Sequence, residues 1–393
     1  MHPLERVMSK KEKIAAGLIS GTSVDGVDSA IIRIKGKDLN LKIELIHFLT
    51  HPYPADIRLK IEQLIKNKSA SLKDIAFLQF KVGEIFADAL IQLCKKSKIP
   101  LKQIDFVGSH GQTVWHSPPE KDKKGSTLQI GDGDVIKERT GITTVSDFRV
   151  SDMAAGGEGA PLVPLVDYIL FRNKIESRGL LNIGGISNIT VIPEKATIND
   201  VFAFDCGPGN TLIDLSAQLL FNQKIDYDGK LALSGKVNQK LLNELMNHPF
   251  ILKKPPKSTG RETFDLSYCK DIIKKGKKLN LSRNDIIATI SEFTAKSIFY
   301  NYENFIAPVV NLKRIILSGG GAFNRYLYHS LKNYFKNIII EKSDIYNIPA
   351  EAKEAVAFAV LAYQAVMGRT SNLPGVTGAK KRVVCGKISL TNR

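Results

Sequence analysis

Length and composition place the chain among ordinary globular proteins. It has 393 residues, 43% of them hydrophobic, and a formal net charge of +17. This length exceeds what one core usually organises, so two domains are predicted, and the composition excludes a fibrous or disordered chain. The positive charge comes mostly from lysines in short runs such as 274–278, without a nucleic-acid-binding motif or an aromatic stacking platform. A solvated surface is therefore favoured over a functional basic face, and no nucleic acid partner is expected.

Cysteine spacing and the N-terminal segment indicate the compartment. The four cysteines, Cys94, Cys206, Cys269 and Cys385, are too far apart for a zinc motif or a dense disulfide framework. Reduced thiols in a reducing compartment fit best. Residues 1–13 are polar and contain no apolar signal core, and no run reaches about 18 apolar residues. We therefore predict a cytoplasmic protein without a membrane partner.

The first half of the chain opens on a strand, a glycine-bounded turn and a second strand within residues 14–34. Apolar spacing then predicts a strand over 41–49, helices over 54–69 and 71–97, a strand over 104–108, a helix over 131–140 and a strand over 143–145.

The second half opens in the same way, with a strand, a glycine turn and a strand within 180–192. Further strands are predicted over 202–205 and 314–317, and helices over 210–220, 237–246, 284–304, 324–336 and 351–367. The echo between the halves is typical of a duplicated α/β domain whose two glycine turns face each other across a cleft.

The first glycine turn has the composition of a phosphate site. Glycine allows close approach of the backbone, hydroxyl and N–H groups bond phosphate oxygens, and Asp25 and Asp28 could hold Mg²⁺ directly or through water. The bland alternative is a hairpin turn, for which Asp-Gly is a common signature. No Walker A pattern occurs in the chain, so an ATP site here would not be a P-loop. The candidate residues are Gly21, Thr22, Ser23, Val24, Asp25, Gly26, Val27 and Asp28.

Further glycine segments follow strands of the second half, where exposed backbone could lie against a nucleotide. Each segment alone is weak evidence, but several of them, each after a buried strand, make a nucleotide site coherent. The candidates are Gly184, Gly185, Gly207, Gly319, Gly320, Gly321 and Asn324.

Several polar side chains are candidates for chemistry and for sugar binding. Asp205 ends an apolar strand beside a glycine turn, which suits a general base or a metal ligand. Its alternative role is to cap the helix that starts near Asn210. The hydrogen-bonding groups of His110, Gln112 and Thr113 suit a sugar, and Arg149 could bind a carboxylate through two parallel hydrogen bonds.

Nine sequence blocks in order resemble the anhydro-N-acetylmuramic acid kinase family. They are GTSVDGVD, GSHGQTVWH, TLQIGD, DFRVSDMAAGGEGAPLVP, LNIGGISNITV, FDCGPGNTLID, KSTGRETF, LSGGGAFN and LPGVTGA, and they run from about Gly17 to Ala379. The resemblance implies the superfamily of actin, sugar kinases and heat-shock ATPases. It implies an α/β fold with two ribonuclease-H-like lobes, mixed sheets flanked by helices, around an ATP cleft. With it we place lobe I at residues 1–145 plus about 368–393, and lobe II at 146–367.

The resemblance also implies a reaction and roles for residues. With ATP, Mg²⁺ and water, the family opens 1,6-anhydro-N-acetylmuramic acid and forms N-acetylmuramic acid 6-phosphate in peptidoglycan recycling. Asp205 is then the expected general base, and Glu354 would help to orient the same water. For Glu354 the alternative is an acidic residue that merely favours the first turn of the last helix.

The sequence leaves two alternative functions open, and it leaves the oligomeric state open. The chain could be a simpler kinase that phosphorylates a free hydroxyl of another amino sugar, without an activated water. It could also be a nucleotide-driven binding protein of the chaperone or filament type. The sequence does not give the oligomeric state, and a homodimer, which is common among such kinases, is one assembly to test.

Overall fold

The computed structural model describes residues 2–21, 23–67, 70–119, 123–260 and 262–391 of the chain. The chain divides into two compact units, Met1–Leu170 with Ala352–Arg393, and Phe171–Glu351. None of the described helices combines the length and apolar character that crossing a lipid bilayer requires.

The first unit is built on a mixed sheet in the order β12-β6-β4-β1-β2-β3, with β5 paired to β4. Strands β1, β2 and β3 are antiparallel neighbours, whereas β1 and β4, and β4 and β6, run parallel. The strands are β1 (Glu12–Ser20), β2 (Gly26–Lys37), β3 (Asn40–Pro52), β4 (Phe106–Ser117), β5 (Ser126–Ile130), β6 (Thr144–Ser146) and β12 (Lys387–Ser389).

Helices of the first unit cover this sheet, and α3 buries its apolar residues in a core shared with β1, β2 and β4. Ser71 starts α3 because its hydroxyl accepts a hydrogen bond from the N–H of Asp74. The helices are α1 (Pro3–Ser9), α2 (Ala55–Asn67), α3 (Leu72–Ser97), α4 (Gly133–Thr140), α5 (Phe148–Ala154), α6 (Val163–Phe171), α14 (Lys353–Val366) and α15 (Pro374–Thr377).

The second unit repeats the same sheet plan in the order β11-β10-β7-β8-β9. Strands β7, β8 and β9 are antiparallel neighbours, whereas β10 runs parallel to both β7 and β11. The strands are β7 (Ser177–Ile183), β8 (Ile186–Ile192), β9 (Phe202–Pro208), β10 (Leu312–Ser318) and β11 (Ile339–Lys342). This repetition confirms the predicted α/β fold with two mixed sheets flanked by helices.

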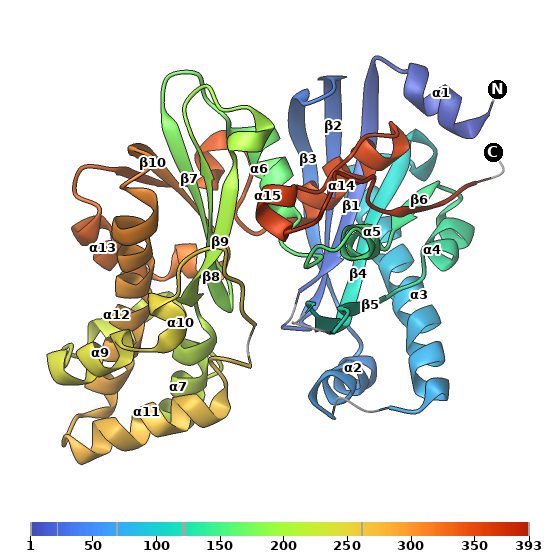
Figure 1. Cartoon of the computed structure of the whole chain (residues 1–393). Coiled ribbons are helices and arrows are strands. Elements are labelled where there is room, and N and C mark those ends of the chain that lie inside the picture. The colour runs from blue at the N-terminus through green and yellow to red at the C-terminus, as the bar shows by residue number, and fades with distance from the viewer. Residues whose placement is uncertain (1, 22, 68–69, 120–122, 261, 392–393) are drawn as a thin grey trace. The chain divides into compact units, whose positions relative to one another are not determined.

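Helix α12 is the central helix of the second unit, and it packs on β9, α7 and α13 (Figure 1). Its buried residues join those of the sheet in one core. The helices are α7 (Thr211–Phe221), α8 (Lys230–Leu233), α9 (Gln239–Met246), α10 (Pro249–Leu252), α11 (Leu266–Lys278), α12 (Arg283–Asn301) and α13 (Arg325–Tyr334).

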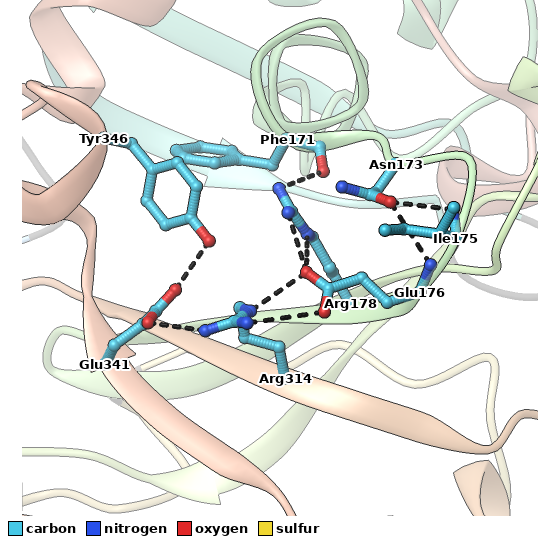
Figure 2. Close-up of polar contacts among 8 residues, drawn as sticks. All are labelled: Phe171, Asn173, Ile175, Glu176, Arg178, Arg314, Glu341 and Tyr346. Carbon is cyan, nitrogen blue, oxygen red and sulfur yellow. Dashed lines mark hydrogen bonds and ion pairs between the residues drawn. The ribbon is translucent and has the colours of Figure 1, made fainter.

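An ion-pair network ties β7, β10 and β11 together away from the glycine turns (Figure 2). The Glu176 carboxylate accepts hydrogen bonds from Arg178 Nε at 2.8 Å and from Arg314 Nε at 2.9 Å. Arg314 Nη1 also donates to Glu341 at 2.6 Å. Burial raises the pKa of Glu176, but the hydrogen bonds from Arg314 and Arg178 outweigh it and hold the pKa below its ordinary value. The network fixes the register of the three parallel strands.

The helix α14 belongs to the first unit, which corrects the domain boundaries expected at 145 and 367. It packs on β1 and β4, and Figure 1 shows this orange-red helix among the blue strands. A Cβ at Gly17 would stand 1.8 Å from the carbonyl oxygen of Ala355, and one at Gly108 would stand 2.1 Å from that of Phe358. Two glycines in neighbouring strands therefore let the helix lie directly on the sheet.

We predict that Gly17→Ala destabilises the protein by about 3 kcal/mol, because the new methyl group would force α14 away from β1. The control is Gly375→Ala, since no described atom lies within 4 Å of the place its Cβ would take. Urea unfolding of both variants measures the effect. Equal stability of the two variants would contradict this account of how α14 is seated.

Candidate active site

The turn between β1 and β2 carries the predicted phosphate-binding residues. The N–H of Val24 donates to the carbonyl oxygen of Gly21 at 3.2 Å, and Val24 adopts a φ of 54° with its side chain buried. Ser23 is exposed, and no described atom lies within 4 Å of a Cβ placed on Gly21. Thr22 lies outside the described residues. Gly21 and Ser23 thus offer an open backbone and a hydroxyl.

The remaining residues of this turn anchor it to the sheet. Val27 is fully buried in the core, and a Cβ at Gly26 would stand 2.5 Å from the carbonyl oxygen of His51 on β3. These two residues therefore set the start of β2 and the direction from which the turn leaves the sheet.

Two carboxylates border the turn. Asp25 forms an ion pair with Arg58 at 3.2 Å, and Asp28 accepts a hydrogen bond from the Thr50 hydroxyl at 2.6 Å. Among the residues that the structure describes, no group of three or more His, Cys, Asp or Glu could hold a metal ion. A pair of carboxylates beside a phosphate site is nevertheless the donor set that Mg²⁺ uses when substrate phosphates complete its shell. Asp25 and Asp28 are therefore the carboxylates of this turn whose chemistry would suit Mg²⁺ held jointly with phosphate oxygens.

Two of the predicted sugar-binding residues take part in the hydrogen bonding of the sheet. The buried Gln112 accepts a hydrogen bond from the Ser20 hydroxyl at 2.5 Å and donates to the carbonyl oxygen of Thr113 at 3.1 Å. The Thr113 hydroxyl accepts from Gln129 at 3.3 Å. Gln112 therefore connects the end of β1, where the turn to β2 starts, with β4.

His110 and Arg149 form a directly bonded pair. Arg149 Nε donates to Nε2 of the buried His110 at 3.0 Å, and His110 Nδ1 lies 3.0 Å from the carbonyl oxygen of Gly111. Burial and the charge of Arg149 hold the pKa of His110 well below its usual value. The imidazole is therefore neutral, donating from Nδ1 and accepting at Nε2, and it fixes the orientation of the guanidinium.

Arg149 and Glu354 influence each other electrostatically. Burial lowers the pKa of Arg149 to about 10, against the charges of Glu354 and Asp152. Desolvation raises the pKa of Glu354, against the charges of Lys353 and Arg149, although solvent reaches the Glu354 side chain. The structure thus brings Glu354, at the first turn of α14, into the neighbourhood of His110 and Arg149.

Asp152 is a buried carboxylate that sequence reasoning missed. It accepts hydrogen bonds from Gly159 N–H at 2.8 Å, from the Asn372 amide at 2.8 Å and from the Thr377 hydroxyl at 2.7 Å. It therefore ties the glycine-rich loop after α5 to the segment around α15. Arg149 donates to the carbonyl oxygen of the same Gly159 at 2.8 Å, so this loop contributes to the placement of the guanidinium.

In the second unit, the turn between β7 and β8 meets the start of α7. The carbonyl oxygen of Gly184 accepts from Asn210 N–H at 2.7 Å, and that of Gly185 accepts from Gly209 N–H at 2.9 Å. A Cβ at Gly209 would stand 2.2 Å from the Gly184 carbonyl oxygen. The absence of a side chain on Gly209 therefore permits this contact.

The glycine segment after β10 joins the same cluster. A Cβ at Gly319 would stand 2.7 Å from the carbonyl oxygen of Ile183, and one at Gly321 would stand 2.3 Å from the Ile183 side chain. At Gly320 the nearest described atom is the Asn210 amide nitrogen, at 3.6 Å. Gly184, Gly185 and Gly319 to Gly321 are thus brought together, and Gly320 presents the most open backbone of the three after β10.

The contacts of Gly207 and Asn324 give both residues a structural role. Gly207 is buried, adopts a φ of 144° and accepts a hydrogen bond from Ser187 at 3.1 Å. Asn324 starts α13 because its side-chain oxygen accepts from the N–H of Leu327 at 3.2 Å. Both residues thus support the backbone around the glycine cluster.

Asp205 lies in β9 and is half-buried. Its carboxylate accepts a hydrogen bond from Thr259 N–H at 2.8 Å, and its own N–H donates to the carbonyl oxygen of Lys257 at 3.1 Å. The segment that contains Lys257 and Thr259 is therefore hydrogen-bonded to both the main chain and the carboxylate of the predicted base. Because Asp205 lies within a strand and not at the helix start, it does not cap α7, which begins at Thr211.

The fold and the candidate site define an α/β protein with two repeated units and a glycine cluster in each. A model of the anhydro-N-acetylmuramic acid kinase family matches residues 13–391. The chain is 45% identical to an anhydro-N-acetylmuramic acid kinase of Caldanaerobacter subterraneus subsp. tengcongensis, over 99% of this chain and 100% of that protein. It is 44% identical to one of Bacillus cereus (strain G9842), over 95% of this chain and 98% of that protein. The chain therefore belongs to the anhydro-N-acetylmuramic acid kinase family.

Solved structures of other proteins are similar at lower levels. Component A of (R)-2-hydroxyglutaryl-CoA dehydratase from Acidaminococcus fermentans has 13% identity and a TM-score of 0.46, covering 90% of this chain and 99% of that one. Gluconate kinase from Lactobacillus acidophilus has 11% identity and a TM-score of 0.42, covering 95% and 93%.

We predict that Gly320→Ala raises the KM for ATP about fivefold, which corresponds to about 1 kcal/mol, because a methyl group would hold the nucleotide away from the backbone. Unfolding stability should change by less than about 0.5 kcal/mol, since the position is open. In contrast, Gly321→Ala should be destabilised, because its Cβ meets Ile183. An unchanged KM for ATP in folded Gly320→Ala would remove Gly320 from the nucleotide site.

Proposed function

We propose that this kinase uses ATP and water to open the 1,6-anhydro bond of anhydro-N-acetylmuramic acid and to phosphorylate the released O6. Water adds its oxygen to C1 and loses a proton to a base, the C1–O6 bond breaks, and O6 takes the γ-phosphoryl group of ATP. The products are N-acetylmuramic acid 6-phosphate and ADP. Family membership over residues 13–391 supports the substrate class, and the carboxylate in β9 supports the water-activating step.

Asp205 is the proposed general base for this water. Opening a glycosidic bond with water requires a carboxylate that removes a proton from the attacking molecule. The hydrogen bond from Thr259 N–H to the half-buried Asp205 supports an oriented carboxylate. O6 needs no proton from an acid, because the phosphoryl group captures it.

Glu354 and the polar residues of the first unit are proposed to handle the sugar and the water. Glu354, whose pKa is raised, would orient the same water as Asp205. Arg149, held by His110 and Gly159, would bind the lactyl carboxylate. His110, Gln112 and Thr113 would line the sugar from β4.

The glycine segments are proposed to hold ATP. Gly21 to Asp28 would contact the phosphates, with Asp25 and Asp28 holding Mg²⁺, whose chemistry is to neutralise phosphate charge during transfer. Gly184, Gly185, Gly207, Gly319 to Gly321 and Asn324 would line the nucleotide. The open backbones of Gly21 and Gly320 support these roles.

A reducing compartment and a homodimer complete the proposal. The four cysteines are free and buried, which fits the cytoplasm. Analogy with other sugar kinases is the ground for proposing a dimer, and sedimentation of the purified protein measures the oligomeric state.

We predict that Asp205→Asn lowers kcat for anhydro-N-acetylmuramic acid by at least about 100-fold, because the amide cannot accept the proton of the water. Nucleotide affinity should stay within about twofold, since the substitution keeps the side-chain shape. The assay follows ADP and sugar phosphate with ATP and Mg²⁺ present. The matched control is Asp271→Asn, an exposed aspartate on α11.

A different outcome for Asp205→Asn would remove its role. If the variant keeps more than about a tenth of the wild-type kcat, the barrier has changed by less than about 1.4 kcal/mol and Asp205 is not the base. A product phosphorylated on a free hydroxyl of an unopened sugar would instead favour the simpler kinase.

We predict that Arg149→Lys raises the KM for the sugar at least about tenfold and leaves the KM for ATP within about twofold. The planar guanidinium of Arg149 donates to both His110 and Gly159 and still has further N–H groups to offer. A lysine ammonium lacks this geometry. Steady-state kinetics with each substrate varied measures the effect. The control is Arg139→Lys, because Arg139 on α4 forms an exposed ion pair with Asp88. A rise in both KM values for Arg149→Lys would contradict a sugar-specific role.

A further inference from the structure

The segment of residues 253–260 holds the proposed base by its backbone. Asp205 N–H donates to the carbonyl oxygen of Lys257 at 3.1 Å, and Thr259 N–H donates to Asp205 Oδ2 at 2.8 Å. The first bond fixes the main chain of Asp205, and the second fixes its carboxylate. The orientation of the base therefore depends on where this segment lies.

One buried side chain anchors the segment. Lys257 is 4% exposed, and its ammonium donates to the carbonyl oxygens of Phe250 at 3.1 Å and Ile251 at 3.0 Å in α10. Its Nζ also lies 5.1 Å from the centre of the Phe250 ring and 5.2 Å from that of Phe305. A buried ammonium is costly unless such partners compensate it, so these contacts hold Lys257 in one place.

The ammonium also acts on the charge of the base. Burial lowers the pKa of Lys257 to about 8, opposed by Cys206 and Asp205 and assisted by Lys253. The attraction between Lys257 and Asp205 works in both directions, so the cation favours the ionised form of the carboxylate. In contrast to Lys257, the neighbouring Lys253 and Lys254 are exposed to solvent.

We propose that Lys257 is the positioning residue of Asp205. Its ammonium fixes the 253–260 segment on α10, so that Thr259 N–H holds the carboxylate in the direction of the water, and its charge favours the ionised form of that carboxylate. This inference rests on the proposed role of Asp205 as the base.

The test compares Lys257→Met, Lys257→Arg and the exposed control Lys254→Met in the full chain. For Lys257→Met we expect kcat to fall at least about tenfold, with KM values for ATP and sugar within about threefold, because a misplaced base affects the chemical step. The acid limb of the kcat profile should move to higher pH, since the carboxylate loses its cation. Lys257→Arg should recover part of kcat and keep the wild-type acid limb. Lys254→Met should match the wild type.

Hydrogen exchange of the peptides covering 253–260 adds a readout independent of activity. In Lys257→Met, exchange at this segment should accelerate while ATP binding is retained, which shows that the protein is folded. A wild-type kcat and acid limb in Lys257→Met, with Asp205→Asn inactive, would overturn the inference alone. So would a loss of kcat without a shift of the acid limb, because that outcome describes a structural lysine. An active Asp205→Asn would overturn the proposed base itself.

Discussion

Direct contact between backbones, at glycines where a Cβ would not fit, positions the candidate functional segments of each unit. In the first unit, Gly17 and Gly108 let α14 lie on β1 and β4, so the chain after α14 stays with this sheet. Glu354 lies in the first turn of this helix and therefore comes close to Arg149, which His110 orients from β4. In the second unit, Gly209 lets the β9–α7 connection meet Gly184.

The repeated sheet plan explains why the candidate residues of the two units occupy similar places in the fold. In each sheet the first strand runs parallel to the fourth, so their carboxyl ends lie at the same edge. The glycine segments start at this edge, at Gly21 in the first unit and at Gly319 in the second. Side chains added to this common backbone plan then differ, with a neutral histidine and an arginine in one unit and a strand carboxylate in the other.

The parts of this organisation that local sequence decides could be predicted from the sequence. The helix expected over 71–97 is observed at Leu72–Ser97, because Ser71 caps it and its apolar spacing is regular. The glycine segments stood out because they follow apolar strands. Asp205 stood out because it was expected to end one, although it lies within β9. The observed units differ from the expected boundaries at α14, because the apolar pattern of this helix does not show which sheet it covers.

The residues that were missed depend on tertiary contacts. Asp152 lies in a polar stretch, and only the folded chain shows that it accepts hydrogen bonds from Asn372 and Thr377 more than 200 residues away. Lys257 is one lysine in a lysine-rich chain, and its burial between two phenylalanine rings leaves no mark in the sequence. Gln112 was selected for its hydrogen-bonding groups, but it lies within β4, and its bond to Ser20 is a contact within the sheet.

The central claim is that one reaction joins water to C1 and transfers phosphate to O6. Turnover of the wild-type protein with ATP and anhydro-N-acetylmuramic acid in ¹⁸O-labelled water tests it most directly, by mass spectrometry of the sugar phosphate. The account predicts one labelled oxygen at C1 and none in the phosphoryl group. A phosphorylated product without label at C1 would contradict hydrolytic opening by an activated water.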